Sequence, residues 1–470
     1  MLKKFYQSFW FSDAIAKEKI VTINKLNSDI NTDICIVGGG FTGLWTAIQL
    51  KKKQPSLSIC IIDKGLCGSG ASGRNGGCML PVSPKYYTMK KLIGKNNAML
   101  MVKATEQALF DIKNFCEQNN IDAKIRLDGN LYTETNKAHV ESFETVIKEL
   151  KKENINSWER WSKEKVQKHT GSQKHIGGYF SPISGSLQPA LLVRGLKKIA
   201  EEKGVQIFEN TPMIKINENK KVTVKVEKGT ITSNKVVMAI NSWTPQHFPS
   251  LARTVILVSS DIIITDPIPE QLNKIGFTDG KVILDSCLFT HYYRTTPDGR
   301  LMFGKGGNLF SFNNKVIPAY DGASLYEKIL KNSFDQFFPS LQSVKFTRSW
   351  NGPSERTKTG FPFFGRLREN SNIFYGFGYS GNGILPSYVG GQIISSMVLD
   401  EDNKWTRSSF CKGPLGLFPP EPFRWIGAIT IRNAVRRKER AEDINKKPLW
   451  IDKKLASLAT NVGRIDRSGI

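Results

Sequence analysis

The sequence predicts an α/β fold, α+β overall, in which a domain of parallel strands and helices is interleaved with a second domain built on a mixed sheet. Three observations carry this prediction. A short apolar run at residues 33–37 leads through a glycine turn into a helical pattern. A second apolar run, at residues 57–62, ends at an acidic residue. From about residue 250 to 348, apolar and polar residues alternate as in antiparallel strands.

The first element is a strand, turn and helix that together predict a Rossmann-like pyrophosphate site. Residues 33–37 are β-branched and apolar, as in a buried parallel strand. They run directly into G-x-G-x-x-G at Gly38, Gly40 and Gly43, and residues 44–50 then have helical spacing. Gly38 permits the tight turn, Gly40 lets the backbone approach a pyrophosphate, and Gly43 lets the helix pack close to the strand. The helix N-terminus adds N–H donors and a positive dipole end.

The second strand and the loop after it indicate a flavin rather than a nicotinamide cofactor. Asp63 follows the strand, twenty residues beyond Gly43, where a carboxylate accepts from an unphosphorylated adenosine ribose. Residues 64–77 then form a glycine- and serine-rich loop, where a nicotinamide-binding domain usually continues into a helix. Such a loop suits a long cofactor, which it can follow from the diphosphate to the ring system.

At this point the sequence resembles the FAD-dependent oxidoreductases of the D-amino-acid oxidase, glycine oxidase and sarcosine oxidase superfamily. The shared motif, GxGxxG…D-(K/R)…GASGRNGG, stands here at residues 38–43, 63–64 and 70–77. The likeness extends over about residues 33–399, through segments 205–216, 235–244 and 373–384. It implies a glutathione-reductase-type FAD domain. In relatives the helix after the last segment points its N-terminus at the flavin, where it stabilises negative charge.

The resemblance also implies which residues bind FAD. They are Gly38, Gly40, Phe41, Thr42, Gly43, Asp63, Lys64, Ser72, Arg74, Asn75, Gly76, Gly77, Met213, Asn241, Gly378, Ser380, Gly381, Asn382 and Gly383. We expect the FAD to be held non-covalently, although Cys78 follows the loop motif and some relatives attach flavin to a cysteine. The five histidines form no metal-binding spacing, so no metal is expected.

The domain boundaries follow from the same segments. We expect a discontinuous FAD-binding domain of residues 30–95, 176–248 and 349–400. Residues 96–175 and 249–348 should form the substrate-binding domain that caps the flavin, and residues 401–470 a C-terminal helical extension.

The resemblance implies that the protein oxidises the CH–NH bond of a small amine or amino acid, with hydride transfer to flavin and hydrolysis of the resulting imine. The flavin carries this chemistry, so the protein mainly binds and orients the substrate. The segments 291–307, 378–384 and 418–427 look most like γ-glutamylputrescine-oxidase-like enzymes and aminophosphonate oxidoreductases. An anionic substrate such as an aminophosphonate would suit this second likeness.

The candidate catalytic residues are Arg294, Lys305, His291 and Arg348. In a strand, His291 and Tyr293 face one way while Tyr292 and Arg294 face the other. A buried Arg294 could hold a carboxylate or phosphonate by two parallel hydrogen bonds, and the alternative is a surface hairpin with Arg294 solvated. A lysine beside the flavin aids oxygen reduction in some relatives, so Lys305 is either such a group or structural. Arg348 lies where relatives cross close to the active site.

The net charge leaves three interpretations open. Lys and Arg exceed Asp and Glu by 67 − 42 = +25, which alone suggests nucleic acid or an anionic membrane. The 48 lysines and 19 arginines are scattered, however, so a lysine-rich surface is favoured and no nucleic-acid partner is expected. An RNA-modifying flavoprotein remains as an alternative.

The tail and the compartment complete the expectations. Residues 425–440 place apolar residues beside a basic run at helical spacing. This helix either packs on the domain or lies on anionic lipid, in which case the enzyme would pass electrons to a membrane quinone instead of oxygen. No long apolar segment or signal peptide is present, and the seven cysteines form no C-x-x-C pair. We therefore expect a soluble, cytoplasmic protein.

Overall fold

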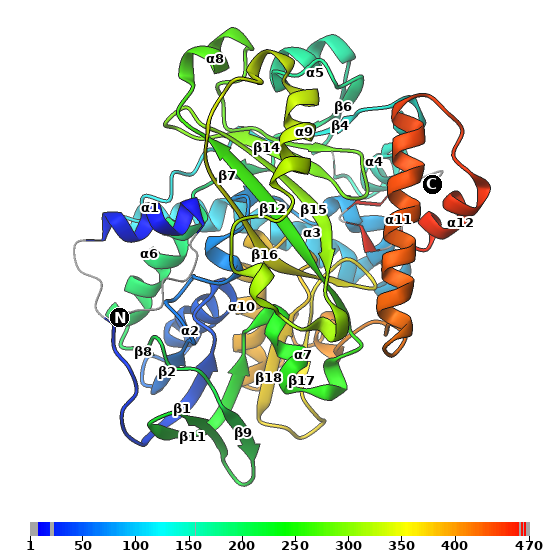
Figure 1. Cartoon of the computed structure of the whole chain (residues 1–470). Coiled ribbons are helices and arrows are strands. Elements are labelled where there is room, and N and C mark those ends of the chain that lie inside the picture. The colour runs from blue at the N-terminus through cyan, green and yellow to red at the C-terminus, as the bar shows by residue number, and fades with distance from the viewer. Residues whose placement is uncertain (1–7, 19–22, 156, 460–461, 464, 467–470) are drawn as a thin grey trace.

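Two eight-stranded sheets organise the chain, and helices cover them (Figure 1). The computed structural model describes residues 8–18, 23–155, 157–459, 462–463 and 465–466. The α/β fold class, with a mixed second sheet, is confirmed. Both sheets take strands from distant parts of the described chain, so the two sheets are interleaved along the sequence.

The first sheet carries the predicted dinucleotide-binding core. Its main path is β17-β18-β11-β1-β2-β8, with β10 and β9 attached beside β11. β1 runs parallel to β2 and β11, and the parallel pairing continues to β8 and β18. The strands are β1 (Ile30–Val37), β2 (Ile59–Ile62), β8 (Gln206–Phe208), β9 (Lys215–Glu218), β10 (Val222–Val226), β11 (Gly229–Met238), β17 (Phe363–Arg366) and β18 (Ile373–Phe377).

Four helices pack on or beside this sheet because they present apolar faces to it. They are α2 (Phe41–Lys53), α3 (Tyr86–Gln118), α6 (Pro189–Glu202) and α10 (Ile384–Val398). α2 and α10 approach closely, since a Cβ at Gly391 would lie 2.7 Å from the Cβ of Trp45. This contact fixes the two helix N-termini that face the cofactor cleft described below.

The second sheet has the order β16-β12-β15-β14-β13-β4-β6-β5. It is mixed because β13 pairs parallel with β4, whereas its other pairs are antiparallel. Its strands are β4 (Asn130–Glu134), β5 (Glu159–Trp161), β6 (Gly177–Ser181), β12 (Val255–Thr265), β13 (Val282–Asp285), β14 (His291–Thr295), β15 (Leu301–Phe310) and β16 (Phe346–Thr357). A separate two-stranded antiparallel sheet is formed by β3 (Cys78–Met79) and β7 (Gly185–Ser186).

Aromatic residues fill the outer face of the second sheet, where Tyr293 and Phe303 pack against Phe334, Phe337 and Phe338. The helices around it are α4 (Glu144–Lys152), α5 (Lys163–Thr170), α8 (Pro269–Lys274) and α9 (Glu327–Phe337), and α7 (Thr244–His247) follows β11. The remaining helices are α1 (Phe9–Lys17), against α6 and β16, and the C-terminal α11 (Phe423–Asp443) and α12 (Trp450–Ser457).

Two strands of the second sheet cross the boundaries expected between the two domains, and the division itself stays a prediction. β6 belongs to the second sheet, although its residues fall in the 176–248 segment expected in the FAD domain. β16 extends to Thr357, past the expected change at residue 349. In both cases the strand pairs with a neighbour of the second sheet, a long-range choice that local patterns do not reveal.

Candidate active site

A cleft runs from the carboxyl ends of the first sheet to the inner face of the second sheet. Gly38, Asp63 and Asn241 line one part of it, and Ser260 and Tyr292 line another. Ligands of open parallel sheets bind at such carboxyl ends, so the position fits a nucleotide cofactor. The cleft then leads from the nucleotide end to a face where a second molecule could meet it.

The glycine turn between β1 and α2 has the geometry that its sequence predicts. Gly38 has a φ of +111°, and a Cβ there would lie 2.6 Å from the Ala239 carbonyl oxygen. A Cβ at Gly43 would lie 2.0 Å from the Gly38 carbonyl oxygen, so α2 can pack this close only with glycine there. At Gly40 the nearest atom is instead the movable Ser72 hydroxyl, at 2.9 Å. Gly40 therefore borders open space that a diphosphate can use.

Asp63 joins the two glycine-rich segments. Its carboxylate accepts hydrogen bonds from Gly39 N at 2.8 Å and Gly65 N at 2.9 Å. Burial nevertheless raises the pKa of Asp63 from 3.8 to about 6. Each carboxylate oxygen retains a second lone pair, so the side chain can also accept from a ribose hydroxyl in the cleft that it lines.

The loop of residues 70–77 is shaped by its own polar side chains. Arg74 donates to the Ser69 carbonyl at 2.8 Å and forms an ion pair with Asp321 at 2.5 Å. Asn75 donates to the Ser72 carbonyl at 2.9 Å and accepts from Gly77 N at 2.8 Å. Ser72 accepts from Phe41 N at 2.9 Å, which ties the loop to the start of α2. These contacts bring the two predicted FAD motifs together.

Two amide oxygens of the cleft lining are buried without a hydrogen-bond partner among the described residues. They are Oδ1 of Asn241 and Oδ1 of Asn382, and both residues line the cleft. An unpaired buried acceptor is costly, so each position favours a ligand that donates a hydrogen bond. FAD carries ribityl and ribose hydroxyls and an adenine amino group, so the residues present fit this cofactor.

Most of the predicted FAD residues line the cleft. These are Gly38, Gly40, Phe41, Thr42, Asp63, Lys64, Ser72, Arg74, Asn75, Gly76, Met213, Asn241, Gly381, Asn382 and Gly383. Gly43, Gly77, Gly378 and Ser380 instead lie behind the lining, where they shape the turns. Cys78 is also in the lining, and non-covalent attachment stays a prediction.

Arg294 is neither the solvated hairpin residue nor a residue of the cleft lining. Its side chain is 2% exposed, and it donates to the carbonyls of Gly76 and Leu187, each at 2.7 Å, and of Thr295 at 3.2 Å. The guanidinium lies 4.9 Å from the centre of a Trp10 ring. Burial lowers the pKa of Arg294 to about 10. In this structure Arg294 holds the loop of residues 70–77 through Gly76 and does not face the cleft.

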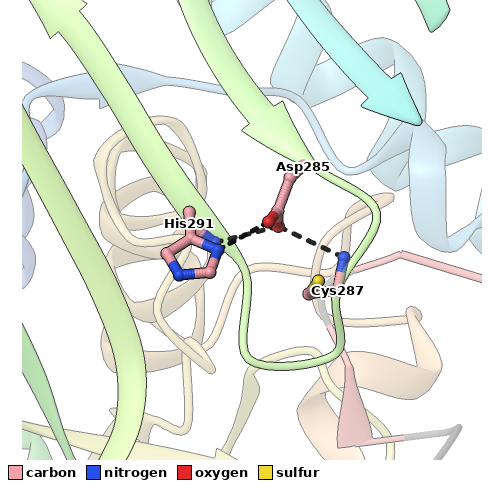
Figure 2. A group of neighbouring side chains, drawn as sticks. All are labelled: Asp285, Cys287 and His291. Atoms are coloured by element: carbon pink, nitrogen blue, oxygen red, sulfur yellow. Dashed lines mark hydrogen bonds and ion pairs between the residues drawn. The ribbon is translucent and has the colours of Figure 1, made fainter. Parts of the chain in front are cut away.

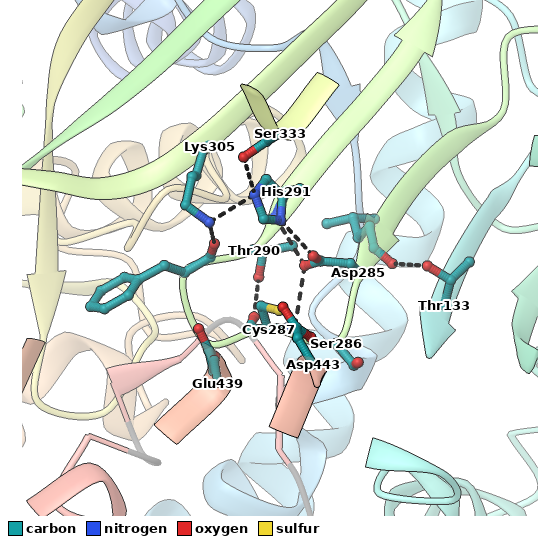
Figure 3. Close-up of polar contacts among 12 residues, drawn as sticks. Thr133, Asp285, Ser286, Cys287, Thr290, His291, Lys305, Ser333, Glu439 and Asp443 are labelled. Atoms are coloured by element: carbon teal, nitrogen blue, oxygen red, sulfur yellow. Dashed lines mark hydrogen bonds and ion pairs between the residues drawn. The ribbon is translucent and has the colours of Figure 1, made fainter. Parts of the chain in front are cut away.

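His291 and Lys305 are paired across β14 and β15, on the opposite face of the second sheet from Tyr292. Figure 3 shows that their side chains contact each other. Lys305 Nζ donates to His291 Nε2 at 2.8 Å and to the Phe289 carbonyl at 3.1 Å. His291 Nδ1 lies 2.6 Å from an oxygen of Asp285. The alternation predicted for this strand therefore holds, and it directs both candidates away from the cleft.

Asp285, Cys287 and His291 offer potential metal-ligand atoms within 4.8 Å of one another (Figure 2). Asp285 already accepts from the backbone N–H groups of Cys287 and His291, at 3.2 and 2.9 Å, besides the imidazole. The Lys305 ammonium lies at the other imidazole nitrogen, where it disfavours a cation. We therefore assign this cluster to closing the β13–β14 hairpin.

Arg348, on β16, donates to Ser12 Oγ at 2.6 Å and so connects the second sheet with α1. Arg348 is not one of the described residues that line the cleft. The four residues predicted to be catalytic are thus placed around the cleft but not in its lining.

The sequence reasoning missed residues that do line the cleft. Tyr292 and Ser260 lie there with their hydroxyl oxygens 2.9 Å apart. A Cβ at Gly304 would lie 2.3 Å from the Tyr292 ring, so this glycine makes room for the tyrosine. The buried carboxylate of Glu355 also belongs to the lining and accepts from Asn241 Nδ2 at 2.6 Å. The strand alternation placed Tyr292 and Arg294 on the same face, but it could not show that Tyr292 lines the cleft and Arg294 does not.

Comparisons with known proteins agree with this geometry. Residues 33–397 match the family model described as FAD dependent oxidoreductase. The chain is 26% identical over 430 residues to the gamma-glutamylputrescine oxidoreductase of Escherichia coli (strain K12), covering 88% of this chain and 95% of that protein. It is 28% identical over 381 residues to the "Probable oxidoreductase OrdL" of Haemophilus influenzae, covering 80% and 84%. The crystal structure of glycine oxidase from Geobacillus kaustophilus has the same fold, with a TM-score of 0.67 at 18% identity, covering 83% of this chain and 99% of that one.

The helices give a separate finding about membranes. None of those in the described part of the chain combines the length and the hydropathy needed to cross a bilayer.

Proposed function

The chain belongs to the family of FAD-dependent oxidoreductases, and from this premise we propose that it oxidises the CH–NH bond of a small amine or amino acid to an imine. It is an FAD-dependent amine or amino-acid oxidoreductase. When bound, FAD supplies the acceptor for the hydride that leaves the carbon beside the nitrogen. The observation that carries the proposal is the cleft, which joins the glycine turn and loop to the inner face of the second sheet.

The protein's own residues bind and orient both molecules. Gly38, Gly40 and Asp63 would hold the adenosine and diphosphate portions, and Asn241 and Asn382 would accept hydrogen bonds from the remaining hydroxyls. Tyr292 and Ser260, 2.9 Å apart, would position the polar groups of the substrate, because either hydroxyl can donate or accept.

The charged residues of the cleft lining favour recognition of a substrate through its cationic amine, and not through an anionic head group. Arg294, the residue predicted to hold a carboxylate or phosphonate, is bound to three carbonyl groups instead. Of the cations in the lining, Arg74 pairs with Asp321, and Lys64 lies 4.0 Å from the centre of the Trp243 ring. Glu355 adds a buried carboxylate to the lining. We propose γ-glutamylputrescine as the first compound to test, since a relative of this chain is named for it.

A spectroscopic titration tests the proposal. The purified protein is mixed anaerobically with γ-glutamylputrescine, glycine, sarcosine, D-amino acids or 2-aminoethylphosphonate, and the flavin absorbance is recorded. We expect an amine to bleach the flavin; readmitted air then distinguishes oxygen from a quinone as the acceptor. Bleaching by 2-aminoethylphosphonate alone would contradict the inference that the cleft does not select its substrate by an anionic head group. A flavin that no amine in the panel reduces would contradict the reaction class.

A further inference from the structure

The C-terminal helix α12 and the loop before it expose an unusual run of large apolar side chains. Leu449, Trp450 and Leu458 are 65%, 72% and 65% exposed, and Ile444 and Ile451 are also exposed. Lys446, Lys447, Lys453 and Lys454 are exposed among them. We call these nine residues the α12 surface. Five exposed apolar side chains within fifteen residues indicate a surface that is covered when the protein works.

The α12 surface is built on a fixed helix. Asp452 and Ala456 are buried beneath α12, and Asp452 forms an ion pair with Arg437 of α11 at 2.6 Å. The opposite side of the helix therefore faces outward, and it carries Trp450, the two lysines 453–454 and Leu458. Figure 1 shows α12 beside α11 at the periphery of the molecule.

The charges of the two C-terminal helices are used differently. On α11, Arg436 donates to Asn308 Oδ1 at 3.1 Å, and Lys438 pairs with Glu442 at 2.7 Å. The basic run that the sequence offered for lipid contact is thus largely occupied within the protein. By contrast, none of the four lysines of the α12 surface pairs with an acidic side chain within the described ranges. Their charges are available to a partner.

We propose that the α12 surface binds the surface of an anionic lipid bilayer. Interfacial helices combine lysine with tryptophan and leucine, because the apolar groups enter the acyl boundary while the ammonium groups remain at the headgroups. A net charge of +25 attracts the whole chain to an anionic surface. Exposed leucine and isoleucine add nothing to phosphate binding on a nucleic acid, so they favour lipid as the occupant.

Vesicle binding tests the proposal with the full-length protein. Wild type should sediment with phosphatidylcholine vesicles that contain phosphatidylglycerol, and much less with phosphatidylcholine alone. Each lysine near an anionic surface contributes roughly fivefold to partitioning, so replacing the four lysines by glutamine should weaken binding at least about 100-fold. The matched control replaces Lys220, Lys221, Lys225 and Lys228, which are exposed on and around the β9–β10 hairpin, by glutamine. It changes the net charge equally and should retain most of the binding.

The apolar residues and the alternatives need a second variant. Trp450→Ser with Leu449→Ser should weaken binding about tenfold or more, and wild type alone should show a blue shift of tryptophan fluorescence on anionic vesicles. Unchanged binding by either α12 variant, or an equal loss in the hairpin control, would overturn the proposal. A homodimer in sedimentation that the α12 variants abolish, without vesicle binding by wild type, would identify a second copy as the occupant instead. Thermal melting of the variants checks that these exposed substitutions leave the fold intact.

Discussion

Substituting Arg294 by methionine separates two functions that the sequence alone leaves open. In the structure the guanidinium donates to the Gly76 and Leu187 carbonyls at 2.7 Å each. Each buried carbonyl that loses its donor costs about 1–3 kcal/mol, and relief of the buried charge returns part of this. The Thr295 carbonyl keeps a second donor, Arg126, so it adds little. We expect a net loss of about 3 kcal/mol in the free energy of unfolding.

The same substitution should weaken cofactor binding, because Gly76 lies in the loop that lines the cleft. Reordering this loop around FAD should consume about 1.4 to 2.8 kcal/mol of binding free energy. Because 1.4 kcal/mol is a factor of ten, the Kd for FAD should rise about 10- to 100-fold. Flavin fluorescence on titration of the apoprotein with FAD measures this Kd. Arg348→Met is the control, because its guanidinium contacts Ser12 of α1 instead of the loop.

The refuting result is specific. If Arg294→Met bound FAD as wild type does and only raised the KM for anionic substrates, Arg294 would be the substrate anchor that the sequence suggested. Arg294→Lys refines the test: lysine keeps the charge but cannot reach both carbonyls in the fork geometry of arginine. Its Kd for FAD should therefore lie between those of wild type and Arg294→Met.

Four further substitutions address the cleft. The folded-state pKa of Asp63 is raised from 3.8 to about 6, so the folded apoprotein binds a proton more readily than the unfolded chain. Its free energy of unfolding should therefore fall by roughly 3 kcal/mol as pH rises from about 3 to about 7, and urea titrations should show that Asp63→Asn removes this slope. Gly40→Val should abolish FAD retention while apoprotein melting stays near wild type, since only a movable hydroxyl lies within 3 Å. Gly43→Ala should instead lower the melting temperature, because its Cβ would lie 2.0 Å from the Gly38 carbonyl oxygen; melting near wild type would contradict the packing argument. Tyr292→Phe should raise the KM for the amine about fivefold with an unchanged Kd for FAD, which steady-state kinetics and flavin titration measure; a changed Kd would place the hydroxyl at the cofactor instead.

The nucleotide end of the cleft could be predicted because its determinants are local. The turn at Gly38, the packing at Gly43 and the acid at Asp63 are all specified within one strand–turn–helix–strand unit. Each residue type there meets a local steric requirement; Gly38, for example, has a φ of +111°, which glycine adopts without strain. A single sequence contains all the information that such a unit requires.

The substrate end could not be predicted in the same way. Strand alternation gave the correct faces for His291 and Arg294, but it could not reveal what each face meets. Arg294 meets the carbonyls of residues 76 and 187, which are 218 and 107 residues away in the chain. Backbone acceptors carry no sequence signal, so an arginine that binds carbonyls looks the same as one that binds a substrate.

The tail shows the same limitation for charge. Helical spacing identified an amphipathic basic segment, but spacing does not say which cations the protein already neutralises. Arg437 pairs with Asp452 and Lys438 with Glu442, whereas the four lysines of the α12 surface lie on the next helix and in the loop before it. The net charge is therefore a poor guide to partners, because it does not show which cations lie outside internal ion pairs.

The loop of residues 70–77 depends on contacts with distant parts of the chain. It is held from three directions: Ser8 donates to the Gly73 carbonyl at 2.5 Å, Trp350 Nε1 to the Arg74 carbonyl at 2.8 Å, and Arg294 to the Gly76 carbonyl at 2.7 Å. The donors come from the start of α1 and from two strands of the second sheet, so a loop that lines the cleft at the first sheet is shaped by the second sheet. A glycine-rich loop has little conformational preference of its own, and such external contacts must supply its order. Interleaving the two sheets along the chain thus couples cofactor binding to the integrity of the substrate face.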